Sequence, residues 1–325
     1  MAALLAGVSA TPVVAAVLTV GPGQQYTTIA GAIATSQDGD TVNVLAGTYV
    51  NDFAEIRTKI ALIAVGGQVR MLAQGLIPNG KGILVTDTDV TITGFMFSGA
   101  RVADANGAGI RYQGGKLVLD RCYFLNNQNG LLGAADPAGT ITVTNSEFAH
   151  NGAASGSTAG YTHNIYVGAI ATFDAENSYF HDANVGHQIK SRAYTTIVNN
   201  SRVVDGPAGT GSYSIDLPNG GNVTITNNQI EQGPRGGNPA MIAFGEEGGV
   251  YAGSTLVVQR NLIENDLASV SSRGVWNATT ITAQITDNAI YGLTSAQLVS
   301  GPANVAGTVT VTKEPPISTR HPWAK

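Results

Sequence analysis

The sequence predicts an all-β protein made of stacked coils, and the main reason is a recurring motif. In each copy two alternating apolar positions lead to a corner, and a small or polar residue and then a bulky apolar residue follow. Successive copies lie 23 to 33 residues apart, which indicates a solenoid whose strands pair with the strands one coil away. The eight copies are Val90–Phe97, Leu117–Phe124, Ile141–Phe148, Phe173–Phe180, Thr196–Val203, Val223–Ile230, Leu256–Ile263 and Ala283–Ile290.

Composition agrees with many short strands joined by tight turns. The 325 residues include 41 glycines, and 12% of them are charged, about half of the usual share. A single solenoid domain can contain a chain of this length. The net charge of −5 is dispersed and leaves no basic field, so no nucleic-acid partner is expected. Cys122 is the only cysteine, which excludes an internal disulfide, and its position in the motif predicts a buried side chain.

The two ends of the chain differ from the repeats. Residues 1–20 are small and apolar, and we interpret them as an export signal without its basic start or, alternatively, as an N-terminal strand on the first coil. Residues 21–312 form the predicted solenoid, and the proline-containing tail 313–325 is expected to be irregular. No later stretch is long and apolar enough to span a membrane.

A short helix is predicted before the first regular coils. Between Tyr26 and Ser36, the apolar residues Ile29, Ala32 and Ile33 have helical spacing. Such a helix would cover the open end of the first coil, which otherwise exposes unpaired strand edges.

The polar residue after each corner is predicted to point inward and to be structural. Stacked coils place these side chains roughly 4.8 Å apart, where amides and hydroxyls hydrogen-bond along the stack. The residues of this ladder are Ser146, Ser178, Ser201, Asn228, Asn261 and Asn288.

A second strand precedes each repeat at a nearly constant distance, and its side chains alternate in direction. An inward ladder is expected at Ile110, Ile165, Ile189, Ile215 and Val275. The outward row one residue later contains Arg111, Tyr166, Lys190, Asp216 and Trp276. The row one residue earlier, which contains Asn164, Gln188 and Ser214, is also predicted to point outward, whereas His163 and His187 have inward parity.

With these features the chain resembles the pectin-lyase-like class of parallel β-helix proteins. The resemblance rests on the coil repeats, on the helix-capped entry from Gly21 and on Gly39–Val44 followed by Gly47-Thr-Tyr49. It implies a single-stranded right-handed parallel β-helix of about ten coils. The class contains pectate and alginate lyases, uronate epimerases, polygalacturonases, pectin esterases, phage tailspikes and noncatalytic surface proteins, so the fold alone does not specify an activity.

Motifs of individual families in this class are weak or missing. Gly186-His187-Gln188 matches the Gly-His-Gly of polygalacturonases at only two of its three positions. No pair of aspartates lies on an outward row beside it. The Asp-Pro-His-Asp sequence of mannuronan epimerases does not occur. The acidic residues are scattered, so no metal ligands are assigned, although Ca²⁺ stays open as a cofactor.

Unusual residues gather in the coils between 161 and 216. Four of the five histidines (His150, His163, His181 and His187) fall within 38 residues in or just before these coils, and long coils flank them. β-Elimination of a uronate needs a cation that neutralises the sugar carboxylate, a base that removes the C5 proton and an acid that assists the leaving oxygen. We assign Arg192 as the neutraliser, Lys190, His163 or His187 as the base and Tyr166 as the acid. Substrate contacts are expected from Asp216, Asn164, Gln188, Tyr161, Arg111 and Trp276.

Structural alternatives exist for the same residues. Lys190 and Asp216 can form a surface ion pair, and the two histidines can be satisfied corner residues. The leading hypothesis is a monomeric, secreted or periplasmic polysaccharide lyase that acts on an acidic polysaccharide. A noncatalytic carbohydrate-binding or surface-structural β-helix is the main alternative, followed by a uronate epimerase or a glycoside hydrolase.

Overall fold

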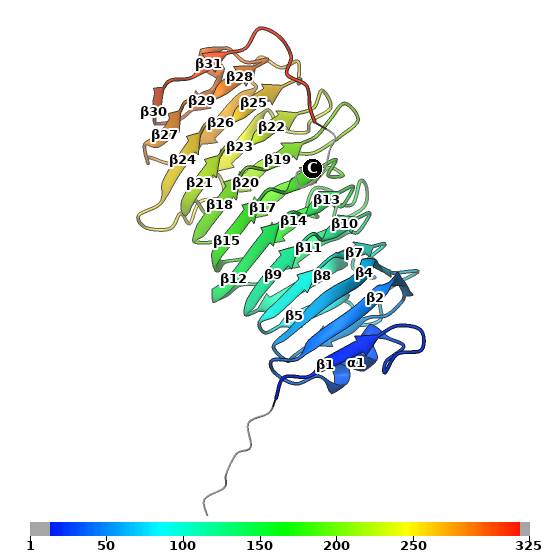
Figure 1. The fold of residues 1–325 in the computed structure, drawn as a ribbon. Coiled ribbons are helices and arrows are strands. Elements are labelled where there is room, and N and C mark those ends of the chain that lie inside the picture. The colour runs from blue at the N-terminus through cyan, green and yellow to red at the C-terminus, as the bar shows by residue number, and fades with distance from the viewer. Residues whose placement is uncertain (1–13, 319–325) are drawn as a thin grey trace, which may run out of the picture.

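The computed structural model describes residues 14–318, which form one rod of stacked parallel strands (Figure 1). The strands form three long faces, and each strand pairs in parallel with its counterpart one coil away. Ten strands make the first face, which is a sheet of its own: β3 (Ala54–Ile56), β5 (Gly82–Asp87), β8 (Ala108–Gly114), β11 (Asn129–Gly133), β14 (Ile165–Val167), β17 (Ile189–Ser191), β20 (Ile215–Leu217), β23 (Ala240–Phe244), β26 (Arg273–Asn277) and β29 (Val299–Ser300).

The other two faces belong to a continuous sheet that bends at the corners. The second face consists of β1 (Val17–Val20), the first halves of β2 (Thr41–Val50) and β4 (Ile60–Leu72), β6 (Val90–Thr93), β9 (Lys116–Asp120), β12 (Asp136–Thr144), β15 (Ile170–Glu176), β18 (Thr195–Asn199), β21 (Asn222–Thr226), β24 (Thr255–Gln259), β27 (Ala283–Thr286) and β30 (Ala303–Ala306). The third consists of the second halves of β2 and β4, β7 (Phe95–Ser98), β10 (Tyr123–Leu125), β13 (Glu147–Ala149), β16 (Tyr179–His181), β19 (Arg202–Val204), β22 (Gln229–Gln232), β25 (Leu262–Asn265), β28 (Ala289–Tyr291) and β31 (Val309–Thr310).

The predicted corner has the same backbone conformation in all eight repeats. Its residue has a positive φ between 47° and 80°, which asparagine and glycine adopt more readily than most residues. The corner residues are Gly94, Arg121, Asn145, Asn177, Asn200, Asn227, Arg260 and Asp287. The polar ladder that follows is inward as predicted, since its six residues are at most 3% exposed.

Apolar side chains fill the interior of the rod along its whole length. Four phenylalanines of successive third-face strands, Phe97, Phe124, Phe148 and Phe180, stack with ring centroids 4.3 to 5.1 Å apart. Cys122 is fully buried in the same core, as predicted. This continuous core gives every coil the same support, so irregular loops can be inserted between coils without disturbing the stack.

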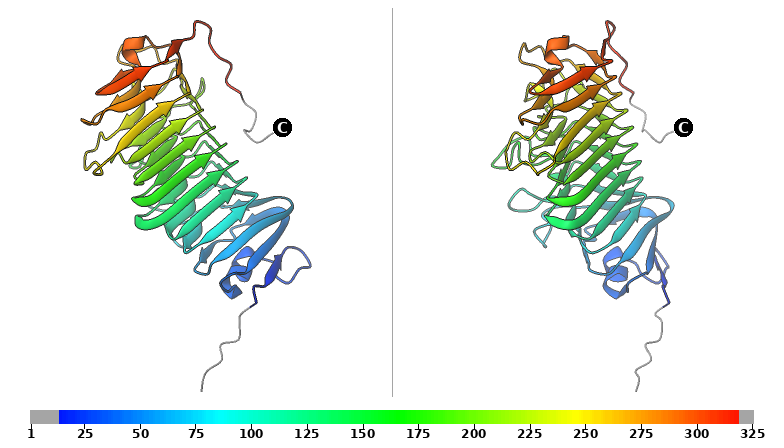
Figure 2. Two further views of the ribbon diagram at one scale, coloured as in Figure 1. Left: turned by 60° about the vertical axis from the view of Figure 1, so that its left-hand side comes forward. Right: turned by 90° about the vertical axis from the view of Figure 1, so that its left-hand side faces the viewer.

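A helix covers the N-terminal end of the rod, as the sequence predicts (Figures 1 and 2). Helix α1 (Ile29–Thr35) buries Ile29, Ala32 and Ile33. The carboxylate of Asp52 accepts hydrogen bonds from the Ile29 and Ala30 backbone N–H groups at 2.6 and 2.9 Å. A 3₁₀ helix, η1 (Ser295–Gln297), lies near the opposite end.

Strand β1 pairs with β2 from Val17 to Val20, so the end of the segment interpreted as an export signal is a strand on the first coil. Residues 1–13 of that segment lie outside the described residues. After β31 the chain has no regular structure and turns back along the outside of the rod (Figure 1). None of the helices in residues 14–318 has the length and apolar character needed to cross a membrane.

Candidate active site

The predicted phase of the first face is confirmed. Ile165, Ile189 and Ile215 are fully buried and lie in register in adjacent strands. Tyr166 is therefore paired with Lys190, and Lys190 with Asp216, on the outer side of the same strands.

Lys190 is the centre of a network of ion pairs. Its Nζ lies 2.5 Å from Asp216 Oδ2 and 2.8 Å from Glu247 Oε1. The expectation of a solvent-exposed Lys190–Asp216 pair is wrong, because Lys190 is only 7% exposed and Asp216 is fully buried. The cause is the loop after β23, which folds over the outward row and brings Glu247 onto Lys190. Burial lowers the pKa of Lys190, but the two carboxylates outweigh it and raise that pKa above its usual value.

Arg192 joins the network from the end of β17. Its Nε donates a hydrogen bond to the Tyr166 hydroxyl oxygen at 2.9 Å, and its Nη1 donates to Asn219 Oδ1 at 2.6 Å. Its Nη2 also forms an ion pair with Glu247 Oε2. Arg192, Lys190 and Tyr166 are thus brought together as the sequence predicted, with Glu247 as a bridge between the two cations.

Three carboxylates meet beside Lys190. Oxygens of Asp216, Glu246 and Glu247 lie within 4.8 Å of one another, so the cluster has the geometry to hold a metal ion. Asp216 Oδ1 and Glu246 Oε2 are both buried, and the two carboxyl groups interact with each other. Burial, followed by the interaction with Asp216, raises the pKa of Glu246 to about 8. Glu246 and Glu247 are adjacent in the sequence, Asp216 lies 30 residues before Glu246, and the fold brings the three together.

The two histidines form a stack on the outer side of the first face. Their ring centroids are 4.6 Å apart, His163 also stacks on Tyr166, and His187 stacks on Tyr213. The expected inward orientation is wrong, because the corner before the strand reverses the parity and places His187 Nε2 3.2 Å from the outward Asp216.

Both histidine rings have one nitrogen occupied by the backbone. His163 Nδ1 accepts from the His187 N–H, and His187 Nδ1 accepts from the Tyr213 N–H. Burial lowers the pKa of His163 well below its usual value and that of His187 to about 4. Neutral His187 carries its proton on Nε2, from which it donates to Asp216.

Asn164 and Gln188 do not point outward, contrary to the expectation. Both are fully buried in the corner between the third and first faces. Asn164 Nδ2 donates to Gln188 Oε1, and Gln188 Nε2 donates to Asp205 Oδ1, each at 2.6 Å. They continue a buried amide ladder from Asn151, which donates to Asn164 Oδ1. The reversal of parity at this corner explains their position, and their hydrogen bonds are structural.

The remaining predicted contact residues lie away from the network. Tyr161 is 79% exposed in the loop before β14. Arg111 is two strands from Tyr166, since Leu132 lies between them in the register, and burial lowers the pKa of its guanidinium. Trp276 is two strands from Asp216, with Ala243 between them.

Trp276 borders a depression at the end of the histidine stack. Its indole is 37% exposed and lies 6.4 Å from the Tyr213 ring, centroid to centroid. Tyr213, Pro239, Arg273 and Trp276 line a cavity of about 370 Å³. Aromatic faces beside an arginine and a charged network are suitable for stacking and pairing with a charged sugar.

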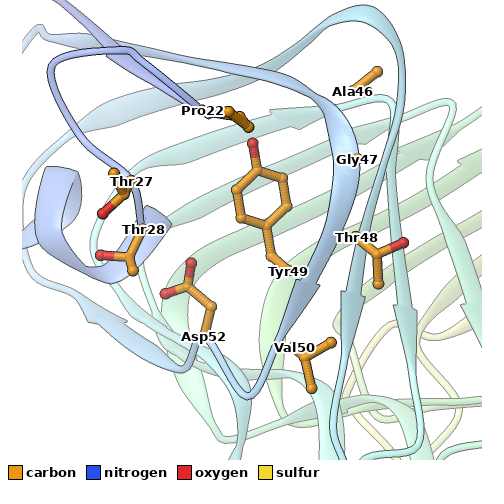
Figure 3. A pocket seen from close by; sticks show the side chains of 9 residues that line it. All are labelled: Pro22, Thr27, Thr28, Ala46, Gly47, Thr48, Tyr49, Val50 and Asp52. Atoms are coloured by element: carbon orange, nitrogen blue, oxygen red, sulfur yellow. The ribbon is translucent and has the colours of Figure 1, made fainter.

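A second cavity of about 370 Å³ lies in the first coils of the rod (Figure 3). Several coils separate it from the network around Lys190. Two of the cavity's polar side chains, those of Asp52 and Tyr49, are engaged in structural contacts. The Asp52 carboxylate caps α1, and the Tyr49 hydroxyl donates to the Leu45 carbonyl at 2.9 Å. We therefore place the candidate active site on the first face.

Four contributors to the site were missed in the sequence: Asn219, Tyr213, Glu246 and Glu247. The 33-residue coil between Ile230 and Ile263 did indicate an inserted loop beside the site. Its length did not show that the loop folds back over Lys190, which only the packing of the coils decides.

No protein-family model matches the sequence, and no curated protein matches it either. Solved structures do match the fold. A pectate lyase, Pel9A, is 13% identical with a TM-score of 0.51, over 90% of this chain and 78% of that chain. The surface adhesin PfbA of Streptococcus pneumoniae is 13% identical with a TM-score of 0.57, over 87% of this chain and 86% of that chain.

ORF18 of Geobacillus virus E2 is 14% identical with a TM-score of 0.54, over 87% of this chain and 56% of that chain. Identities this low show a common fold and nothing finer. The parallel register of every face and these structural likenesses agree with each other. The protein has the right-handed parallel β-helix fold of the pectin-lyase-like class.

Proposed function

We propose that this protein is a carbohydrate-active enzyme, and specifically a lyase that cleaves an acidic, uronate-containing polysaccharide by β-elimination. The observation that carries the proposal is the convergence of Lys190, Arg192 and Tyr166 in one connected network on the outer side of the first face. The pectate lyase among the structural neighbours shares the fold. Such a substrate points to a secreted or periplasmic protein.

Arg192 is the residue proposed to pair with the uronate carboxylate. It is the more accessible of the two cations, because its side chain is 23% exposed and that of Lys190 is 9% exposed. A sugar carboxylate can take the place of Glu247 on the guanidinium, since both are planar anions that match its donors. Neutralising the sugar carboxylate makes the C5 proton more acidic.

Tyr166 is the proposed acid. Its oxygen accepts a hydrogen bond from Arg192 Nε, so its own O–H proton is free to point at a leaving oxygen. In the elimination the base removes the C5 proton, the C4–O bond breaks, a C4=C5 double bond forms, and the departing oxygen receives the tyrosine proton.

Lys190 is the proposed base, in preference to His163 and His187. Each histidine already accepts a backbone N–H on Nδ1, and His187 donates its other nitrogen to Asp216. Lys190 can act as a base only while Asp216 and Glu247 do not both hold it as a cation. The two histidines are then positioning residues that orient Asp216 and support Tyr166.

The carboxylates of this site also fit a calcium ion. Asp216, Glu246 and Glu247 place carboxylate oxygens within 4.8 Å of one another, and carboxylate oxygen is the donor that Ca²⁺ prefers. Asp216, Glu246 and Glu247 would hold the ion. When bound, it would supply positive charge for the substrate carboxylate.

The test is incubation with a panel of uronate polysaccharides, with and without calcium, while the ultraviolet absorbance of the unsaturated product is followed. We expect Arg192→Ala and Tyr166→Phe to reduce kcat/KM by at least about a hundredfold, the order of magnitude of a lost proton-transfer or charge-pairing group. Arg260→Ala is the matched control, because Arg260 lies on a corner of the rod, where it donates to Asn227. Equal activity in all variants would refute these roles.

A noncatalytic carbohydrate-binding β-helix is the second candidate. It is favoured by the pairing of Lys190 and Arg192, because both cations already bind protein groups. A surface adhesin also shares the fold. Binding of an acidic glycan without unsaturated product, and loss of that binding in Arg192→Ala, would support this candidate over the lyase.

A further inference from the structure

The third face of the rod has an acidic cluster that the proposed function does not use. Glu231 and Glu264 lie in register in β22 and β25, next to the inward residues Ile230 and Ile263. Their side chains have outward parity, yet both residues are fully buried.

The cover over these residues is the C-terminal segment after β31. Gln229 donates a hydrogen bond to the Pro316 carbonyl at 3.4 Å, and Arg202 donates to the Ser318 carbonyl. The segment thus runs back past β22 and β19. Figure 2 shows it turning back beside the rod. Glu314 of this segment arrives beside Glu264 and Asp266, and one oxygen from each of the three carboxylates lies within 4.8 Å of the others.

The carboxylate of Glu264 is poorly compensated by the protein groups around it. Both of its carboxylate oxygens are buried without a close hydrogen bond. Burial raises the pKa of Glu264 to about 7, and the side chain of Gln229 opposes that rise. The carboxylate belongs to the cluster that includes Glu314. Glu231 Oε1, one coil away, is also buried without a close hydrogen bond. None of the ion pairs within residues 14–318 involves Glu231, Glu264, Asp266 or Glu314.

We propose that Glu264, Asp266 and Glu314 form a second divalent-cation site, of the calcium class, which fastens the C-terminal segment to the third face. Glu264 is buried, Asp266 is half-buried and Glu314 is exposed. A buried carboxylate is unfavourable unless a positive charge compensates it or it takes up a proton. Three carboxylates and no nitrogen or sulfur ligand are typical of a hard cation, and the flexible geometry of Ca²⁺ tolerates a ligand from a segment without regular structure.

This site is independent of the proposed active site. Its ligands come from β25, from the turn that follows it and from the tail, whereas Asp216 lies in β20 of the first face and Glu246 and Glu247 lie in the loop after β23. The role of the cation here is mechanical. It connects residue 314 to residues 264 and 266, so the affinity of the site and the attachment of the tail are coupled.

The test is calorimetric titration of the full-length protein with calcium chloride, beside Glu314→Gln, Asp266→Asn and Glu247→Gln. Glu314→Gln should fold normally, because the substitution lies in the tail outside the coils. We expect it to weaken one calcium site by on the order of tenfold or more, as should Asp266→Asn. Glu247→Gln should leave this site intact, whatever it does to the first face.

The second readout is digestion with a carboxypeptidase, followed by mass spectrometry. Calcium should slow the removal of residues around 314 in the wild type and in Glu247→Gln, but not in Glu314→Gln. Calcium binding that is identical in the wild type, Glu314→Gln and Asp266→Asn would overturn the proposal, and so would the absence of calcium binding. Neither result would bear on the lyase proposal, whose test is product formation.

Discussion

Asp205 shows how burial of one titratable group couples folding to pH. It is 2% exposed in the polar corner, where Gln188 Nε2 donates to its Oδ1 and its Oδ2 has no partner. Burial raises its pKa to about 6. A carboxyl whose pKa is higher in the folded state than in the unfolded state lowers stability as the pH rises between those two values.

We therefore predict that Asp205→Asn stabilises the protein above about pH 6. The gain approaches roughly 3 kcal/mol at most, from a pKa that rises from 3.8 to about 6, and it disappears below the lower value. The asparagine oxygen can still accept from Gln188. Urea unfolding at several pH values between 3.8 and about 6 measures the slope, and Glu176→Gln on the exposed end of β15 is the control. An unchanged slope in Asp205→Asn would contradict the prediction.

At the scale of the element, the inward asparagine ladder stabilises each corner through the coil beside it. Asn261 Oδ1 accepts from the backbone N–H and the Nδ2 of Asn228 at 2.9 and 3.0 Å. Asn261 Nδ2 donates to the Ile225 carbonyl, and its own backbone N–H donates to Asn288 Oδ1. One side chain thus satisfies polar groups of the preceding coil that water cannot reach.

We predict that Asn261→Ala destabilises the protein by about 1–3 kcal/mol for each backbone group that it leaves without a partner. The affected groups are the Asn228 N–H and the Ile225 carbonyl. Chemical denaturation compares it with Gln284→Ala, which removes an exposed amide from β27 and should cost little. A loss no larger than that of the control would show that the ladder is dispensable.

The same scale explains why the site residues were only partly predictable. A strand alternates its side chains strictly, so Tyr166, Lys190 and Asp216 were placed correctly from Ile165 and its counterparts. Corners do not alternate. Asn164 and Gln188 precede the strand by one residue and therefore turned inward, whereas the His163 and His187 rings lie outside.

At the scale of the whole molecule, the rod depends on contacts between coils more than on the continuity of the chain. The loop before β14 interrupts the chain between β13 and β14, but β13 pairs with β10 and β16, and β14 pairs with β11 and β17. Each side of the loop is thus attached to both neighbouring coils.

We predict that chymotrypsin cleaves the folded protein after Tyr161, which is 79% exposed, and that the two fragments stay together. Their interface is the full cross-section of the rod, with the stacked Phe148 and Phe180 on its two sides. Size-exclusion chromatography should show one species and denaturing electrophoresis two. Tyr161→Ala should resist this cleavage, and separation of the fragments under native conditions would count against the prediction.

The sequence by itself determined the coil repeat, the corner positions, the capping helix and the inward ladders. Those features are periodic, and periodicity records which side of a strand or helix is buried. Only the tertiary structure decided what covers the outward rows. The loop after β23 brings Glu246 and Glu247 to Lys190, and the C-terminal segment brings Glu314 to Glu264. Such encounters join residues tens of positions apart, and they depend on the paths of irregular segments, which no repeat encodes.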